Sequence, residues 1–482
     1  MRGSLMATAR GLIAVDRWAM GELATPDGDE TMAELLARTA PSPAEDHLRR
    51  LCAGCHLGAR RDDRDDAVVG IGSGCGACHG GPRTPGAAHR PVDGKVGDER
   101  CLGCHSRSGR ISLAYQGLAE VDAARPSGCG AAVALFDGRS GCAMPADVHQ
   151  RAGLACVDCH LHSELMGDGL AHRHAAEAVE VTCQSCHGPV APDGETTWAR
   201  VDDAITRDRL RQLGEARPDG ERVRLGRRGT PLWNLRPGPE PGAWQLVGKL
   251  DGARHAVRPT PSDAAHRQAG HERLTCSACH STWAPRCATC HTRFEPGEAQ
   301  WDFGRAALAP GSWLESHEQL DVGPPSLGVD DAGHIGPAVP GMLADLDARA
   351  AGGPRRDLRL YAPIAPHTTG AARGCASCHA DARALGLGSA RLALAPDGVA
   401  LEPARPDDRW VDLFAAAAPG TRRNARSLDP DEQRRALRVG YCLGCHAAGD
   451  ALWLAFDDAL ARLREGRAPT CRGAFGAWMS AR

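Results

Sequence analysis

Cys156-Val157-Asp158-Cys159-His160 is one of nine copies of the pattern Cys-x-x-Cys-His, and this repeated pattern decides how the chain is interpreted. The chain has 482 residues, of which 21 are Cys and 21 are His, so random order would produce far fewer than one match. One chemistry is therefore repeated along the sequence. The nine copies run from Cys52 to His56, Cys75 to His79, Cys101 to His105, Cys156 to His160, Cys183 to His187, Cys276 to His280, Cys287 to His291, Cys375 to His379 and Cys442 to His446.

The spacing of this motif suits covalent attachment of a haem. Two thiols three positions apart reach the two vinyl groups on one edge of the porphyrin, and the adjacent His then lies beneath the iron as the proximal ligand. A zinc knuckle needs two pairs of ligands and does not require a His after each second Cys, and a thioredoxin-like pair does not explain nine copies. The sequence predicts nine covalently bound c-type haems, each with one iron.

The predicted haem ligands follow directly from the motifs. The thioether cysteines are Cys52, Cys55, Cys75, Cys78, Cys101, Cys104, Cys156, Cys159, Cys183, Cys186, Cys276, Cys279, Cys287, Cys290, Cys375, Cys378, Cys442 and Cys445. The proximal iron ligands are His56, His79, His105, His160, His187, His280, His291, His379 and His446.

Three cysteines lie outside the motifs, namely Cys129, Cys142 and Cys471. Cys129 and Cys142 flank a Gly-rich segment, and a disulfide between them would close a short loop and stabilise the fold by roughly 3 kcal/mol. Free thiols or ligand thiols are the alternative at these positions.

Twelve histidines also lie outside the motifs, and ligation of every iron by two His would use nine of them. The eight Met are mostly remote from the motifs, so His/Met sites, which raise the potential, are at best a minority. The sequence indicates low-potential, six-coordinate haems.

Composition bears on the fold. Aromatic residues make up 4% of the chain, and there are 58 Gly and 33 Pro, which by themselves suggest a weak core and many loops. Large apolar porphyrins would compensate, with folding coupled to their attachment. We expect a mostly α fold of short helices with extensive loops and little sheet, and a core built largely from covalently attached haems.

The spacing of the motifs suggests five parts. They are an N-terminal segment (1–46), a pentahaem module (47–190), a haem-free spacer with short extended pieces (191–270), a tetrahaem C-terminal module with insertions (271–446), and a C-terminal helix and tail (447–482).

Two C-terminal helices have clear signals. Asp429 followed by Pro430 predicts an N-cap and first helical residue, with the helix running into Cys442. Leu452, Phe456 and Leu463 then recur at helical spacing, which favours a packed helix.

The charge and hydropathy of the chain indicate which partners and which membrane segments to expect. The formal net charge is -3, and no basic stripe with interleaved aromatics points to nucleic acid. The sequence contains no run of eighteen apolar residues, so it predicts no transmembrane helix. The start of the chain offers only Gly11 to Val15 as an apolar run, so no signal peptide is visible.

Two stretches resemble the periplasmic multihaem cytochromes c, including the octahaem reductase-like members. One runs from Asp147-Val148-His149 through the fourth motif to Met166-Gly167-Asp168-Gly169, and the other is His271-Glu-Arg-Leu-Thr-Cys276-Ser-Ala-Cys-His280. The resemblance covers the haem-bearing residues 47 to 446. It implies haems arranged as a wire, distal His ligands that arrive from elsewhere in the fold, and a periplasmic or otherwise extracytoplasmic location, because haem attachment in this family is completed there.

The resemblance also suggests distal iron ligands. The strongest candidates are His149, shortly before the fourth motif, and His271, shortly before the sixth. The other candidates are His47, His174, His367, His89, His255, His266 and His334, which leaves His162, His172 and His317 as surplus.

Two classes of function compete. The first is an electron-transfer protein that accepts electrons from a redox protein or a quinol-oxidising membrane cytochrome, with no catalytic residue of its own. The soluble half of an outer-membrane conduit inside a porin is a variant of this class. The second is a reductase of a small nitrogen or sulfur oxyanion with one open-coordination haem. The catalytic Cys-x-x-Cys-Lys variant of the family is absent, and Tyr115, Tyr361 and Tyr441 lack the surroundings of a crosslinked Tyr. We favour electron transfer.

Overall fold

The fold is described from a computed structural model of the chain. The described residues are 3–56, 74–80, 91–106, 112–121, 131–135, 138–189, 198–212, 214, 217–240, 242–263, 265–287, 289–316, 320–388, 390–395, 398–402, 411–447, 450–465 and 467.

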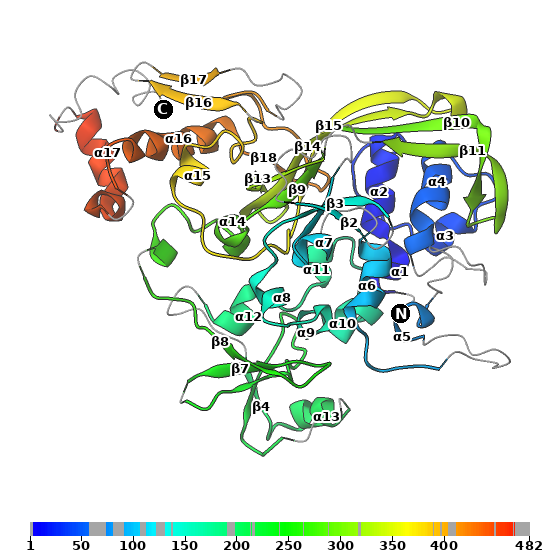
Figure 1. The fold of residues 1–482 in the computed structure, drawn as a ribbon, viewed down its shortest axis with the longest axis horizontal. Coiled ribbons are helices and arrows are strands. Elements are labelled where there is room, and N and C mark those ends of the chain that lie inside the picture. The colour runs from blue at the N-terminus through cyan, green and yellow to red at the C-terminus, as the bar shows by residue number, and fades with distance from the viewer. Residues whose placement is uncertain are drawn as a thin grey trace.

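The expectation of a mostly α fold with little sheet is wrong. About 32% of the structure is helix and 25% is strand, and the described residues contain a six-stranded sheet (Figure 1). The order of this sheet is β11-β10-β14-β13-β18, with β15 paired to β14. Its strands are β10 (Thr289–Asp302), β11 (Ala307–Ser316), β13 (Ser326–Val329), β14 (Ile335–Asp347), β15 (Arg355–Pro363) and β18 (Arg426–Ser427).

Pairing within this sheet is mixed. β10 and β11 form a long antiparallel hairpin, whereas β10 and β14 run parallel, with Thr289 opposite Leu343. β14 pairs antiparallel with β13 and with β15. The parallel contact joins the strand that carries the end of the seventh motif to the centre of the sheet.

The sheet escapes prediction because small residues, Gly and Pro interrupt the β-branched residues of its central strands. Ala338 and Ala344 are buried on β14, and all four residues of β13 are buried, but β-branched residues such as Val329 occur singly and form no run that would give a strand signal. Gly and Pro, which suggested loops, lie within the strands themselves, as at Gly336 and Pro337. Composition therefore understated the sheet content.

The expectation of a core built largely from attached haems is also wrong. In the described residues, side chains of the chain itself form five hydrophobic clusters. One cluster joins Leu327 and Val329 of β13 to Tyr361 of β15 and Leu437 of the C-terminal helix α16 (Pro430–Leu443). The dense apolar interior around the sheet therefore comes from protein side chains packed on one another.

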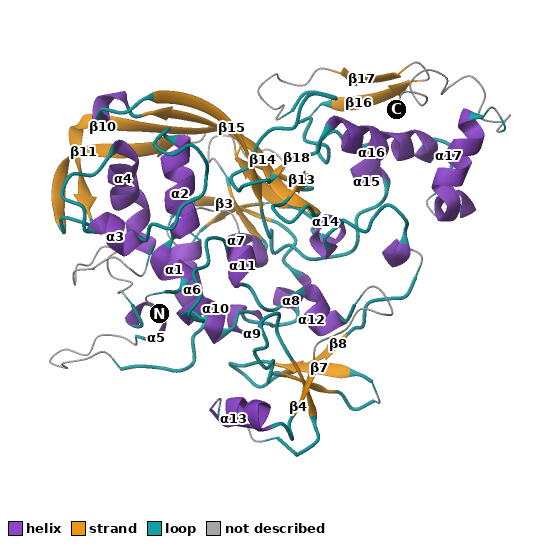
Figure 2. Ribbon diagram, turned by 180° about the vertical axis from the view of Figure 1, so that it is seen from behind, coloured by secondary structure: helices purple, strands orange, loops and turns teal. Residues whose placement is uncertain are grey.

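Helices from the N-terminal segment cover one end of the sheet (Figure 2). They are α1 (Leu5–Thr8), α2 (Arg10–Ala19), α3 (Met32–Leu36) and α4 (Pro43–His47). Met20, just after α2, and Ala44 of α4 pack with Trp313 of β11 and Leu346 of β14. The N-terminal segment is thus anchored by apolar burial.

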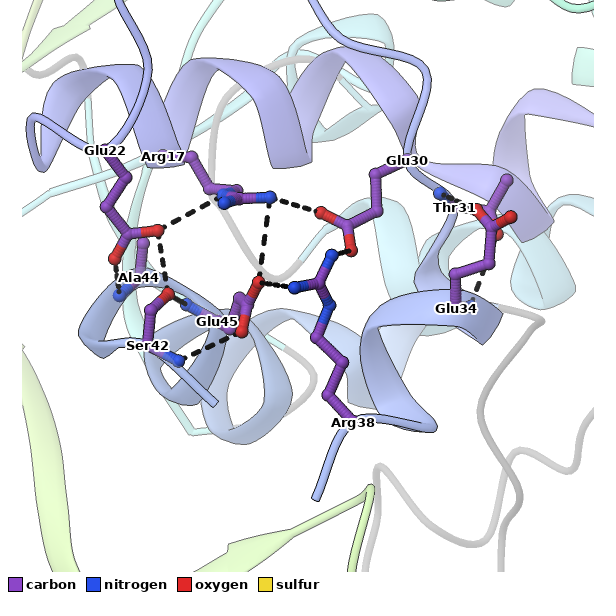
Figure 3. Close-up of polar contacts among 9 residues, drawn as sticks. All are labelled: Arg17, Glu22, Glu30, Thr31, Glu34, Arg38, Ser42, Ala44 and Glu45. Atoms are coloured by element: carbon purple, nitrogen blue, oxygen red, sulfur yellow. Dashed lines mark hydrogen bonds and ion pairs between the residues drawn. The ribbon is translucent and has the colours of Figure 1, made fainter. Parts of the chain in front are cut away.

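An ion-pair network ties these N-terminal helices together (Figure 3). Arg17 lies 3.1 Å from Glu22, 2.6 Å from Glu30 and 3.6 Å from Glu45. Arg38 pairs with Glu30 and Glu45. Glu45 is 2% exposed, so the network is partly shielded from water, where paired charges interact more strongly. It holds α4, and therefore His47 at its end, in place.

Most motifs lie on short helical turns, separated by small sheets and connecting helices. The motif-bearing turns are η1 (Leu48–Cys52), η2 (Ala53–Cys55), α5 (Gly76–His79), α6 (Asp98–His105), α9 (Cys156–Cys159), α12 (Cys183–His187), α14 (Cys276–His280) and α15 (Ala376–His379). The other helices are α7 (Ser112–Tyr115), α8 (Val148–Arg151), α10 (His162–Met166), α11 (Ala175–Ala178), α13 (Ala204–Gln212) and α17 (Phe456–Arg464).

The remaining strands form small sheets. They are β1 (Leu118–Glu120), β2 (Ala132–Ala134), β3 (Ser140–Ala143), β4 (Trp198–Arg200), β5 (Arg222–Arg224), β6 (Leu235–Pro237), β7 (Trp244–Val247), β8 (Arg254–Val257), β9 (Ala284–Cys287), β12 (Leu320–Gly323), β16 (Arg391–Ala395) and β17 (Gly398–Glu402). Strands β4 to β8 all belong to the motif-free stretch between the fifth and sixth motifs, where they form a two-stranded and a three-stranded sheet.

The predicted N-cap of the penultimate helix is confirmed. α16 begins at Pro430, and the Asp429 carboxylate accepts hydrogen bonds from the backbone N–H groups of Asp431 and Glu432. The helix continues to Leu443, so the ninth motif lies at its C-terminal end. The next helical pattern forms α17, preceded by the helical turn Ala451–Ala455.

Candidate haem-ligand site

The helical backbone of the motifs places both thiols on one side. Residues three apart in a helix share a face, so Cys183 and Cys186 of α12 project in the same direction. The seventh motif differs, because Cys287 ends β9 and the motif continues on β10.

Most motif histidines are oriented by a hydrogen bond at Nδ1. In eight of them, Nδ1 lies 2.6–3.3 Å from a carbonyl or carboxylate oxygen. Five donate to backbone carbonyls: His56 to Met6, His79 to Asp93, His187 to Arg258, His280 to Gly370 and His379 to Ala436. A carbonyl only accepts, so Nδ1 carries the proton and Nε2 keeps the lone pair that binds a metal.

The remaining three of these motif histidines face carboxylates. His160 contacts Glu164 at 2.9 Å, His291 contacts Asp345 at 3.3 Å, and His446 contacts Asp450 at 3.2 Å. A carboxylate at this position fixes the orientation of the imidazole ring. The sequence did not predict these partners. Glu164 and Asp450 each lie four residues after a motif His, and this spacing is the signal that could have identified them.

The main feature of the site is that four motif histidines each face a histidine from outside the motifs. The ring centroids are 6.1 Å apart for His187 and His149, 6.2 Å for His160 and His367, 6.2 Å for His280 and His266, and 6.0 Å for His379 and His271. With metal–nitrogen bonds of about 2 Å, two imidazoles on opposite sides of one metal have centroids roughly 6 Å apart. The four pairs therefore fit the two axial ligands of a haem iron.

The non-motif partners are held by the same type of hydrogen bond. Nδ1 of His149 lies 2.8 Å from the Asp147 carboxylate, and Nδ1 of His266 lies 2.8 Å from Asp263. His367 donates from Nδ1 to the Ala365 carbonyl at 2.8 Å. In these three partners, as in the motif histidines, the contact at Nδ1 leaves Nε2 available as a metal ligand.

His367 occupies an unusual backbone conformation. Its φ is 55°, in the left-handed region that non-glycine residues rarely adopt. Flanking hydrogen bonds hold the loop: the Thr369 N–H donates to Asp147, and the Thr368 hydroxyl donates to the Trp283 carbonyl. Such strain persists where surrounding structure enforces it, often at functional sites.

Burial keeps several of these imidazoles neutral. It lowers the pKa of His271, of His367 and of His379 below the ordinary value of about 6.5. The neutral ring is the form that binds iron. The environment of these side chains therefore suits metal ligation.

The other distal candidates that lie within the described residues make no ring contact with a motif histidine there. His47 is 4% exposed and packs on Trp313 with centroids 5.2 Å apart. Burial lowers the pKa of His47, but the carboxylates of Asp16 and Glu315 outweigh it and raise the pKa to about 10. Nε2 of His255 is buried and has no hydrogen-bond partner, as expected of a nitrogen reserved for a ligand.

The remaining histidines outside the motifs differ in exposure, and two of them lie outside the described residues. His174 lies against Gly11 of α2. His334 is 57% exposed and lies 3.5 Å from Asp330. His172, a surplus candidate, contacts Asp168 through Nε2 at 2.8 Å, so this nitrogen is engaged. His162 begins α10, and His89 and His317 lie outside the described residues.

Successive motifs lie next to one another in space. The side chain of Cys101 lies beside that of Cys156, and the side chain of Cys183 lies beside that of Cys276. These contacts join the third motif to the fourth and the fifth to the sixth.

Further contacts extend the series at both ends. α5 packs against α6, and the Arg373 N–H, two residues before the eighth motif, donates to the Cys279 carbonyl of the sixth at 2.8 Å. Figure 1 shows α5, α6, α9, α12, α14 and α15 along one arc below and beside the sheet. The third and fourth, the fifth and sixth, and the sixth and eighth motifs are therefore neighbours in the described structure.

Cys142 is disulfide-bonded, and Cys129 and Cys471 lie outside the described residues. Among the described residues, no group of three or more His, Cys, Asp or Glu is placed to hold a metal ion, whereas axial ligation of a porphyrin iron needs only two protein ligands. No described helix combines the length and the apolar character needed to cross a membrane.

Comparison of the chain with protein-family models, with curated proteins and with solved structures finds no match.

Proposed function

We propose that this chain is a multihaem c-type cytochrome that carries electrons along a series of covalently attached, mostly bis-histidine haems between redox partners in the cell envelope. The observation that carries the proposal is the set of four ring pairs at 6.0–6.2 Å. Each haem supplies an iron that exchanges one electron between ferric and ferrous states.

The protein contributes fixed ligands to such a function. The Nδ1 hydrogen bonds set the tautomer and the ring plane before any metal binds, which reduces reorganisation when the charge on iron changes. Two imidazoles on one iron leave no position for a substrate at the four paired sites. This arrangement favours electron transfer over reduction of an oxyanion.

The arrangement of the motifs supports conduction across the molecule. The side chains of Cys101 and Cys156 are neighbours, so the groups attached at the third and fourth motifs would also lie close together. The donor is a redox protein or a quinol-oxidising membrane cytochrome. The site of action is periplasmic or otherwise extracytoplasmic, as in the multihaem cytochromes that the motifs resemble.

A spectroscopic experiment tests this proposal. A pyridine haemochrome assay on the purified holoprotein is expected to return nine haems per chain that resist acid-acetone extraction. Low-temperature EPR of the oxidised protein is expected to show predominantly low-spin iron. A count of seven or fewer contradicts occupation of every motif. A stoichiometric high-spin haem that binds nitrite, hydroxylamine or sulfite and turns it over with a reduced viologen replaces the proposal with the reductase.

A further inference from the structure

Two arginines, of which one is buried and one partly buried, contact the backbone of two Cys-x-x-Cys-His motifs. Arg224 of β5 is 6% exposed, and its Nη1 donates to the carbonyls of Ser185 and Cys186, both at 2.7 Å. Ser185 is the residue just before the second Cys of the fifth motif. A side chain from the motif-free spacer therefore closes the C-terminal end of α12.

The eighth motif is held in the same way. Nη2 of Arg373 donates to the carbonyl of Ser377 at 2.7 Å, and Nη1 donates to the carbonyl of Pro325 at 3.0 Å. Ser377 occupies the same motif position as Ser185. Because the backbone N–H of Arg373 also binds Cys279, this residue joins the sixth and eighth motifs.

These contacts satisfy a structural need of short helices. The last carbonyls of a helix have no partner within it, and a cation placed there is favoured by the helix dipole. A guanidinium has several donors in a fixed plane and stays charged when buried. One side chain can therefore hold two neighbouring carbonyls, as Arg224 does.

The surroundings of Arg224 strengthen its electrostatic effect. Its guanidinium carbon lies 4.9 Å from the ring centroid of Trp198 and 4.6 Å from that of Trp244. Aromatic rings displace water, and a charge in such a medium interacts more strongly with its neighbours. The charge lies beside Cys186, a predicted thioether position.

We propose that Arg224 and Arg373 are positioning residues that hold the fifth and eighth motif turns and raise the reduction potentials of the haems attached there. The inference rests on the proposed function. A fixed positive charge disfavours the more positive, ferric state of a nearby iron, so electrons are held more tightly at these two sites.

The first experiment compares two neighbouring arginines. Arg222, on the same strand, stacks on Trp198 at 4.5 Å but is exposed, and it does not contact a motif within the described residues. In holoprotein followed by EPR-monitored redox titration, Arg224→Met is expected to move one component to lower potential and leave the others in place. Arg222→Met is expected to leave all components unchanged, and Arg224→Lys, which keeps the charge, is expected to restore most of the shift.

A second position keeps the test decisive if Arg224→Met yields no holoprotein. Arg373→Met is expected to lower the potential of a different component, and Arg373→Lys to restore it. Unshifted potentials in both Met variants, or the same shift in Arg222→Met, overturn the inference. The inference is also overturned if neither Met variant gives holoprotein and neither Lys variant restores it.

The outcome is separable from that of the proposed function. Haem counting and the spin state of the unaltered protein test the proposed function. Mass spectrometry of the peptides that carry the fifth and eighth motifs shows whether those two sites are occupied. With both occupied, the potentials report on the arginines even if another motif lacks its haem.

Discussion

Hydrogen bonds at Nδ1 decide which nitrogen of each histidine is available to a metal. His149 and His172 illustrate the contrast, since His149 uses Nδ1 to contact Asp147 and His172 uses Nε2 to contact Asp168. Only the first arrangement leaves Nε2 for iron. Position relative to a motif is a poorer guide, because His149 precedes the fourth motif but faces His187 of the fifth.

This contrast gives a prediction at the residue scale. His149→Ala is expected to convert one low-spin haem to high-spin or water-ligated iron and to raise its potential, because water is a weaker donor than imidazole. EPR of the oxidised protein measures the change. His172→Ala is the matched control and is expected to leave the spin state unchanged. An unaltered low-spin spectrum for His149→Ala would show that His149 is not an axial ligand.

At the scale of single elements, α16 links the sheet to the last two motifs. Its first turn carries Glu432, which is 6% exposed and pairs with Arg426 at 2.7 Å and Arg273 at 2.8 Å. Its later turns supply the Ala436 carbonyl to His379, and its end carries the ninth motif. Docking of this helix therefore affects two attachment sites.

The docking is expected to depend on pH through Glu432. Burial raises the pKa of Glu432, but hydrogen bonds from Arg426, Asp429 and Arg273 outweigh it and lower the pKa to about 2. A depressed pKa means that the stabilisation is present above the unfolded value of about 4.3 and is lost as pH falls toward 2.

Glu432→Gln is therefore expected to cost about 2 kcal/mol near neutral pH. Thermal unfolding of the holoprotein, followed by haem absorbance, measures this loss. The cost should shrink as the pH is lowered below 4. Asp431→Asn, at a neighbouring carboxylate that is 74% exposed, is the control and should have little effect. Equal destabilisation by both variants would argue against a specific role for Glu432.

The whole molecule combines a side-chain core with a series of attachment sites. Trp313, Leu346 and Leu360 are buried around the sheet among other side chains, whereas the motif turns α5, α9 and α15 are only four residues long. Helices this short are unstable without tertiary support. Attachment of haem should therefore matter most at the motif turns.

A chain made without haem attachment tests this division. Expressed in a host that lacks the attachment machinery, it is expected to keep protease resistance in the strands β10 to β15 and to be cut rapidly around the fourth and fifth motifs. Limited proteolysis with mass spectrometry maps the cuts, and the holoprotein serves as the reference. Equally fast cleavage of the sheet would mean that its core also depends on the attached groups.

The sequence by itself determines the nine Cys-x-x-Cys-His motifs, because each consists of five consecutive residues. It also carries the N-cap of α16 at Asp429, which is a local hydrogen-bond pattern. Only the tertiary structure decides the pairing of His187 with His149 and of His379 with His271, since these partners are 38 and 108 residues apart in the chain. It also decides the sheet, whose central strands contain Ala, Gly and Pro and form through long-range pairing and burial.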